Sequence, residues 1–198
     1  MSQKNDKEKI LFFRESVFKV AEQLFNYPNT TFHIRLLEEE TGFSTTAVTA
    51  AVQELKSYKI ARVEETPIKT DVCANLEGRE YRFYKLVFNL YRLQRWGFVD
   101  LLVDVFQNPE AIVVYGSFAR GEDIEKSDVD ILIVTSLSSS AINDIEQESS
   151  FLLRKKAFEK EFNRRLDFKV FNSLDKSAPE FKNSIANGIV LSGYVRVI

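Results

Sequence analysis

Three aspartates in the second half of the chain are candidates for a shared chemical task. Asp128 and Asp130 lie two positions apart at the start of an apolar run, and Asp167 interrupts a later one. Side chains at positions i and i+2 of a strand project from the same face, so we expect the first two carboxylates to converge. Two close like charges raise pKa values unless a cation lies between them, and carboxylate oxygens suit Mg²⁺. The spacing therefore indicates a metal site.

Each carboxylate also has a simpler explanation. Asp-x-Asp pairs on exposed loops are commonly just solvated. An acid within an apolar strand needs a partner, and Asp167 has three arginines that could form an ion pair with it: Arg120, Arg164 and Arg165. The alternative is that Asp167 faces the other two carboxylates across adjacent strands. There it could bind a metal and help to deprotonate an attacking hydroxyl, and the residues alone leave both possibilities open.

A Gly116–Ser117 turn follows the apolar run at 111–115. Glycine has no Cβ, so a phosphate can approach its backbone closely. Free amides at the start of a helix favour an anion, and the Ser117 hydroxyl adds a donor. Such turns also occur for geometric reasons alone.

These pieces together resemble a known family. Residues 116–122, Gly-Ser-Phe-Ala-Arg-Gly-Glu, are followed by Ser-Asp-Val-Asp at 127–130 and by the lone Asp167. This pattern resembles the DNA polymerase beta-like nucleotidyltransferase superfamily, and most of all its small, minimal microbial members. The resemblance covers about residues 88–198. It implies a small domain with a mixed sheet flanked by helices, and a magnesium-dependent nucleotidyltransferase.

The resemblance also implies roles for individual residues. Asp128 and Asp130 would hold two Mg²⁺ ions, and Asp167 would complete the site at the catalytic metal. Other residues of the motif would bind a nucleoside triphosphate, expected to be ATP. Gly116 and Ser117 would hold its β- and γ-phosphates. Arg120 would either contact the ligand or pin the loop by pairing with an acid. The nucleotide-binding residues are Gly116, Ser117, Arg120 and Ser127.

The implied reaction is the transfer of a nucleoside monophosphate, expected to be AMP, to a hydroxyl acceptor with release of pyrophosphate. Two metals can stabilise the attacking and the leaving oxygen together. Most of the remaining catalysis comes from the positioning of the reacting groups. The acceptor stays open: a nucleic acid end, a protein side chain and a small hydroxylated molecule are all compatible.

Hydrophobic periodicity predicts the elements that position these residues. Helices are expected at 10–25, 34–40, 44–55, 90–106 and 141–161, and strands at 60–63, 81–87, 111–115, 129–134 and 166–171, before a tail helix and a strand at 194–197. Two helices around a Gly-containing turn, followed by two strands, predict a winged helix-turn-helix. The fold class is therefore α+β, with a winged helix-turn-helix domain at 1–88 and a nucleotidyltransferase domain at 89–198.

The first domain suggests duplex DNA as a further partner. The outer face of the third helix and the wing offer groups for bases and phosphates. The candidate DNA-binding residues are Thr45, Thr46, Thr49, Gln53, Lys56 and Arg82. Glutamates at 38–40, 54 and 64–65 dilute any basic patch, and winged helices also bind proteins. The alternative function is a winged-helix DNA-binding transcription regulator that uses the transferase fold as a nucleotide sensor.

Composition supports a cytoplasmic protein. The net charge is −2, which gives no strong attraction to nucleic acid or membrane. The single cysteine, Cys73, cannot form an internal disulfide, which is typical of a reducing compartment. Residues 1–9 do not read as a signal peptide, and no apolar run has the length of a membrane span.

Overall fold

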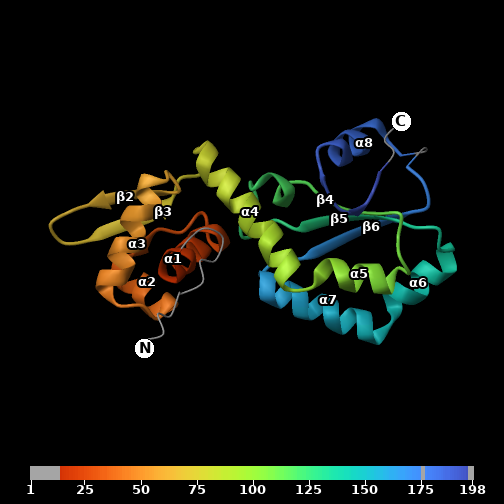
Figure 1. Ribbon diagram of the computed structural model, residues 1–198, viewed down its shortest axis with the longest axis horizontal. Helices are drawn as coiled ribbons and strands as arrows, with labels where there is room; N and C mark the ends of the chain where they lie inside the picture. The colour runs from red at the N-terminus through yellow and green to blue at the C-terminus, as the bar shows by residue number, and fades with distance from the viewer. Residues whose placement is uncertain (1–13, 175–176, 196–198) are drawn as a thin grey trace, which may run out of the picture. The chain divides into compact units, whose positions relative to one another are not determined.

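The computed structural model describes residues 14–174 and 177–195 (Figure 1). The chain divides into two compact units, residues 1–88 and 89–198. Helix α4, Arg79–Arg95, runs through the division. Among the described residues no helix combines the length and the apolar character that a membrane crossing needs.

The first unit combines helices with a small antiparallel sheet. Its elements are α1 (Glu15–Asn26), β1 (Phe32–His33), α2 (Ile34–Thr41), α3 (Thr45–Ser57), β2 (Ala61–Glu65) and β3 (Thr70–Ala74). The strands are ordered β1-β3-β2 and all pairings are antiparallel. Apolar residues at helical spacing form the buried faces of α1 and α3. The start of the first predicted helix, residues 10–13, lies outside the described residues.

The strand predicted at 81–87 is wrong, because this segment belongs to helix α4. Tyr81, Lys85 and Phe88 are each at most 2% exposed, whereas Phe83 is 59% exposed. Buried positions at i, i+4 and i+7 have the period of a helix. The seven residues of the predicted strand are too few to distinguish this period from the alternation of a strand. The antiparallel hairpin after α3 is instead formed by β2 and β3, and Arg82 lies on a helix rather than on a strand.

The second unit is built on a mixed four-stranded sheet of order β6-β5-β4-β7. Strand β4 pairs antiparallel with β5 and β7, and β5 pairs parallel with β6. The elements are α5 (Phe98–Val105), β4 (Ala111–Tyr115), η1 (Phe118–Arg120), β5 (Val129–Val134), α6 (Ser139–Gln147), α7 (Ser149–Phe162), β6 (Leu166–Phe171), α8 (Pro179–Ala186) and β7 (Ile189–Gly193).

The two faces of this sheet have different coverings. Helices α5 and α7 cover one face, where Phe98 and Phe158 pack against Ile131 in the larger core. Helix α8 lies over the other face (Figure 1), where Ile185 packs with Val113 in a smaller core. Because both faces are covered, all five residues of β4 are buried. The small core leaves part of its face for polar side chains.

Three further elements differ clearly from the sequence-based expectations. The helix predicted at 90–106 is broken at Gly97, whose φ of 71° is left-handed, so α4 and α5 are separate helices. The helix predicted at 141–161 is divided by Glu148, whose extended backbone caps α7. The strand predicted at 194–197 lies earlier, at β7, and residues 196–197 of that prediction lie outside the described residues.

Candidate active site

The register of β5 and β6 brings two of the predicted carboxylates together. These strands are parallel, and Asp130 is the direct partner of Asp167. Neighbouring positions in register project from the same face of a sheet, and both residues lie on the face that α8 covers. Asp128 lies two residues before Asp130, at the point where β5 begins.

A row of three polar side chains crosses the sheet at this level. In the antiparallel pairing of β4 and β5, the partner of Asp130 is Tyr115. Burial raises the pKa of Asp130, and the charges of Asp167 and Asp128 raise it further. Burial, followed by the charges of Asp130 and Asp167, also raises the pKa of Tyr115. The row thus brings together two negative charges, of which Asp130 is half-buried and Asp167 is exposed.

Asp128 differs from the other two carboxylates because it has a cationic partner. The Arg165 guanidinium donates from Nε and Nη2 to the two Asp128 oxygens, at 3.1 and 3.2 Å. This bidentate contact lowers the pKa of Asp128. The other two arginines considered as partners for Asp167 also pair elsewhere: Arg120 with Glu122 at 2.8 Å and Arg164 with Asp123 at 3.3 Å.

A polar cavity of about 380 Å³ opens beside β6. Its lining consists of Asp128, Lys155, Glu159, Arg165, Leu166 and Asp167. Two of the three predicted carboxylates therefore border one solvent-accessible space, together with the cations of Lys155 and Arg165. With the side chains arranged as in this structure, no three or more His, Cys, Asp or Glu residues within 14–174 and 177–195 are positioned to hold a metal ion. The Asp128 carboxylate is instead bound by the Arg165 guanidinium.

Gly116 lies against the Asp130 carboxylate. Its φ is 72°, a left-handed conformation, and a Cβ added there would lie 2.2 Å from Asp130 Oδ2. A side chain at this position would therefore clash as well as strain the backbone. The turn predicted to bind phosphate and the central carboxylate of the row are direct neighbours.

The neighbouring motif residues shape the loop. Ser117 precedes a single 3-10 turn, and its hydroxyl does not cap that turn. Arg120 pairs with Glu122, two residues further along the same loop. Ser127 acts differently, because its hydroxyl accepts a hydrogen bond from the Ile124 amide at 2.9 Å. That contact closes the turn that leads into Asp128.

A buried polar network ties this loop to its surroundings. Asn89 of α4 donates to the Phe118 carbonyl at 3.0 Å and to Asp123 at 2.9 Å. Asp123 also pairs with Arg164, and both side chains are at most 3% exposed. The network joins α4, the loop between β4 and β5, and the entry to β6. It thereby fixes the three segments that lead to the predicted site residues.

Sequence reasoning missed several residues of this site. Tyr115 and Lys169 lie on the same face as Asp130, and the Lys169 charge lowers the pKa of that aspartate. The period-2 pattern could have found both, because positions 167 and 169 share a face and 115 ends the strand before the Gly-Ser turn. Asn89 and Asp123 had no comparable signal, since their contact depends on the tertiary fold.

The first unit presents the face expected to contact DNA. Thr45, Thr46, Thr49, Gln53 and Lys56 are exposed on α3. Two of them are engaged by one acid, Glu65, which accepts from Gln53 at 3.1 Å and lies 4.0 Å from the Lys56 ammonium. Other cations of this unit are also paired with glutamates, including Arg14 with Glu54, Lys59 with Glu80 and Arg62 with Glu77.

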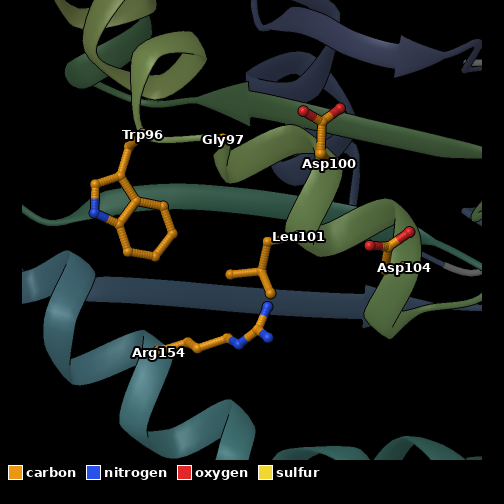
Figure 2. A pocket seen from close by; sticks show the side chains of 6 residues that line it. All are labelled: Trp96, Gly97, Asp100, Leu101, Asp104 and Arg154. Carbon is orange, nitrogen blue, oxygen red and sulfur yellow. The ribbon is translucent and has the colours of Figure 1, made fainter.

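A second cavity of about 360 Å³ lies between α5 and α7 (Figure 2). It is lined by Trp96, Gly97, Asp100, Leu101, Asp104 and Arg154, which come from α5, the turn before it and α7. Figure 2 shows Arg154 extending from α7 toward α5. None of the predicted site residues lines this cavity, so it is separate from the carboxylate row.

Comparison with known proteins agrees with the second unit. Residues 98–192 match the family described as the nucleotidyltransferase domain. This match supports the nucleotidyltransferase superfamily for that part of the chain, and with it a general nucleotidyl-transfer activity and a nucleoside triphosphate substrate. No curated protein matches the chain. Helix α4 precedes the matched residues, although its Asn89 is hydrogen-bonded to Phe118 and Asp123 inside the matched region.

Proposed function

We propose that the protein is a magnesium-dependent nucleotidyltransferase that transfers AMP from ATP to a hydroxyl acceptor in the cytoplasm. The observation that supports this most is the parallel register of Asp130 with Asp167, with Asp128 two residues away. A protein that only senses nucleotide has no need of three acidic groups at one place.

The carboxylate oxygens are the hard donors that Mg²⁺ prefers. The raised pKa of Asp130 is a further reason to assign a cation here, because a divalent ion would relieve the repulsion between it and its neighbours. Asp128 and Asp130 would hold two ions, with Asp167 at the catalytic one, once Asp128 exchanges its Arg165 contact for the metal. When bound, the metals would neutralise charge on the attacking and leaving oxygens.

The remaining groups bind and orient the nucleotide. The Gly116–Ser117 backbone and the Ser117 hydroxyl, which does not cap the 3-10 turn, would hold the β- and γ-phosphates, while Arg120 pairs with Glu122 within the loop. The acceptor oxygen attacks the α-phosphorus and its proton passes to Asp167. The bond from the α-phosphorus to the bridging oxygen breaks, and pyrophosphate leaves.

Incubation with α-labelled ATP, Mg²⁺ and a cell lysate tests this proposal. Label should appear on a macromolecule or a small hydroxylated product with the wild-type protein, and should not appear with Asp130→Asn. Treatment of the labelled product with nuclease or protease then identifies the acceptor class. Absence of labelling with all four nucleoside triphosphates would contradict the proposal.

The first unit is proposed to be a winged helix that recruits the substrate, with duplex DNA as its ligand. The element order α1-β1-α2-α3-β2-β3, with an antiparallel sheet ordered β1-β3-β2, supports a winged helix. The exposed polar face of α3 supports base contact. The regulator alternative shares this surface and differs in lacking transfer, so the labelling experiment distinguishes the two.

A further inference from the structure

The Tyr115 side chain has a polar group that the fold does not use. The residue is 6% exposed, and its hydroxyl finds no hydrogen-bond partner among the described residues. A buried hydroxyl without a partner loses its bonds to water and gains none in return. Phenylalanine would fill the same space without this penalty, so the hydroxyl calls for an explanation.

The position of Tyr115 gives one. It is the register partner of Asp130, which is itself the register partner of Asp167, so all three side chains project from one face. A tyrosine reaches further from the sheet than an aspartate does. A ligand held by the two carboxylates would therefore lie beside the Tyr115 hydroxyl. The Phe181 ring, edge-on to the tyrosine ring at 5.7 Å, restricts how that ring can turn.

The chemistry of the hydroxyl selects the ligand group. A phenol is protonated at neutral pH, because its ordinary pKa is about 10. A protonated phenol is a hydrogen-bond donor, and the bond is strongest when the acceptor is charged. The adjacent residue is Gly116, which begins the proposed phosphate-binding turn.

We infer that the Tyr115 hydroxyl is a substrate-binding group that donates a hydrogen bond to a phosphate oxygen of the nucleotide. This inference rests on the proposed function, because the carboxylate row is taken to hold the nucleotide through its cations. The bond forms only in the complex, so the hydroxyl adds to affinity for the substrate and not to the stability of the free protein.

The test is Tyr115→Phe, which removes one oxygen atom. Binding of Mg·ATP and of Mg·tripolyphosphate is measured by calorimetry on the full chain, alongside thermal melts without ligand. Both ligands should bind roughly tenfold more weakly to the variant, as expected for one charge-assisted hydrogen bond. The melting temperature of the free variant should equal or exceed that of the wild type.

Tyr81→Phe is the matched control. The Tyr81 hydroxyl is buried like that of Tyr115 but donates to the Leu24 carbonyl at 3.3 Å. Its removal should lower the melting temperature and leave both affinities unchanged. The two substitutions delete the same atom from different environments. Tyr115→Phe should weaken ligand binding without lowering the melting temperature, and Tyr81→Phe should do the reverse.

Three results would overturn the inference. Unchanged affinities in Tyr115→Phe would show that the hydroxyl makes no ligand contact. Weaker binding of ATP alone would move the contact to the nucleoside. A loss of melting temperature like that of Tyr81→Phe would show a structural hydrogen bond. If the wild type binds no nucleoside triphosphate while remaining folded, the proposed function fails and the inference with it; if only Tyr115→Phe is silent, the proposed function stands.

Discussion

Two carboxylates, one in each unit, have opposite environments. Asp71 on β3 lies 2.7 Å from the Lys69 ammonium and 2.6 Å from His33 Nδ1, and the hydrogen bond from Lys69 is the main cause of its lowered pKa. Asp130 on β5 lies beside Asp167, and burial together with that charge raises its pKa. Asp71 thus has a direct cationic partner in Lys69, whereas the like charges of Asp167 and Asp128 outweigh the charges of Lys169 and Arg120 near Asp130.

The difference separates charges that support the fold from charges that await a ligand. A carboxylate with a lowered pKa favours the folded state, whereas one with a raised pKa disfavours it while ionised. The free protein gains nothing from keeping Asp130 beside Asp167. Here two like charges are held together near the start of β5, next to Gly116 with its left-handed backbone. Such an unfavourable arrangement of charges indicates a functional site.

The largest effect is expected from Asp130→Asn. Transfer should fall by at least about 100-fold, because a central ligand and its charge are lost. The shift in melting temperature that Mg·ATP induces should disappear. The free variant should be at least as stable as the wild type, since one of the repelling charges is removed. Thermal melts with and without Mg·ATP measure both effects.

Asp71→Asn is the control for this change, because it is the same substitution in the paired environment. It should lower the melting temperature of the free protein and leave the Mg·ATP shift intact. If Asp130→Asn keeps its ligand-induced shift, the assignment of this residue to the nucleotide site is wrong.

The second prediction concerns a charge pair inside the second unit. Arg164→Met should lower the free energy of unfolding by about 3–5 kcal/mol, because Asp123 would keep a buried charge without its cation. Urea denaturation measures the loss. Arg14→Ala, which breaks the exposed pair with Glu54, should cost less than about 1 kcal/mol.

A double variant makes this prediction sharper. Adding Asp123→Leu to Arg164→Met removes both charges and should recover much of the lost stability. If the double variant is no more stable than the single one, the network is not held by this ion pair. Asn89 then has to supply the stability through its hydrogen bonds to Phe118 and Asp123.

Much of the second unit could be predicted from sequence. The strands at 111–115, 129–134 and 166–171 have the extents that apolar runs and alternation predict. The i, i+2 spacing predicts that Asp128 and Asp130 lie close together, and the Asp128 charge contributes to the raised pKa of Asp130. The family resemblance agrees with the matched residues 98–192.

What could not be predicted depends on contacts between distant segments. The register that sets Asp130 opposite Asp167 is a property of the β5–β6 pairing, and sequence spacing carries no information on it. The choice of Arg165 for Asp128, rather than for Asp167, is likewise tertiary. The alternation of residues 81–87 wrongly predicted a strand, because these seven residues are only part of the helix Arg79–Arg95 and too few to reveal its helical period.

The third prediction asks whether the paired charges of the first unit are free to bind DNA. If α3 contacts duplex DNA, Lys56→Ala should lower the log–log salt slope of binding by about 0.9, the value for one phosphate contact. Glu65→Gln should raise affinity, because that acid engages both Lys56 and Gln53. Gln53→Ala should alter sequence preference more than salt dependence.

Salt titrations on random and selected duplexes measure these effects. Lys56→Ala and Glu65→Gln change the same contact in opposite directions, which separates a DNA contact from a loss of folding. If micromolar wild-type protein binds neither duplex at low salt, the unit is a protein-binding module, and the search for an acceptor should turn to proteins.

The smallest effect is expected in the pH dependence of Asp71. Its pKa in the folded protein lies below the unfolded value of 3.8, so the unfolded chain binds more protons between the two values. Stability therefore rises with pH through this window, and the contribution of Asp71 is present above about pH 4 and lost as the pH falls through the folded pKa. The difference in melting temperature between the wild type and Asp71→Asn should be smaller below about pH 4 than at roughly pH 5. A difference that stays constant at acid pH would mean that the asparagine variant loses packing rather than an ion pair, and Asp71 would then no longer represent the compensated member of the comparison.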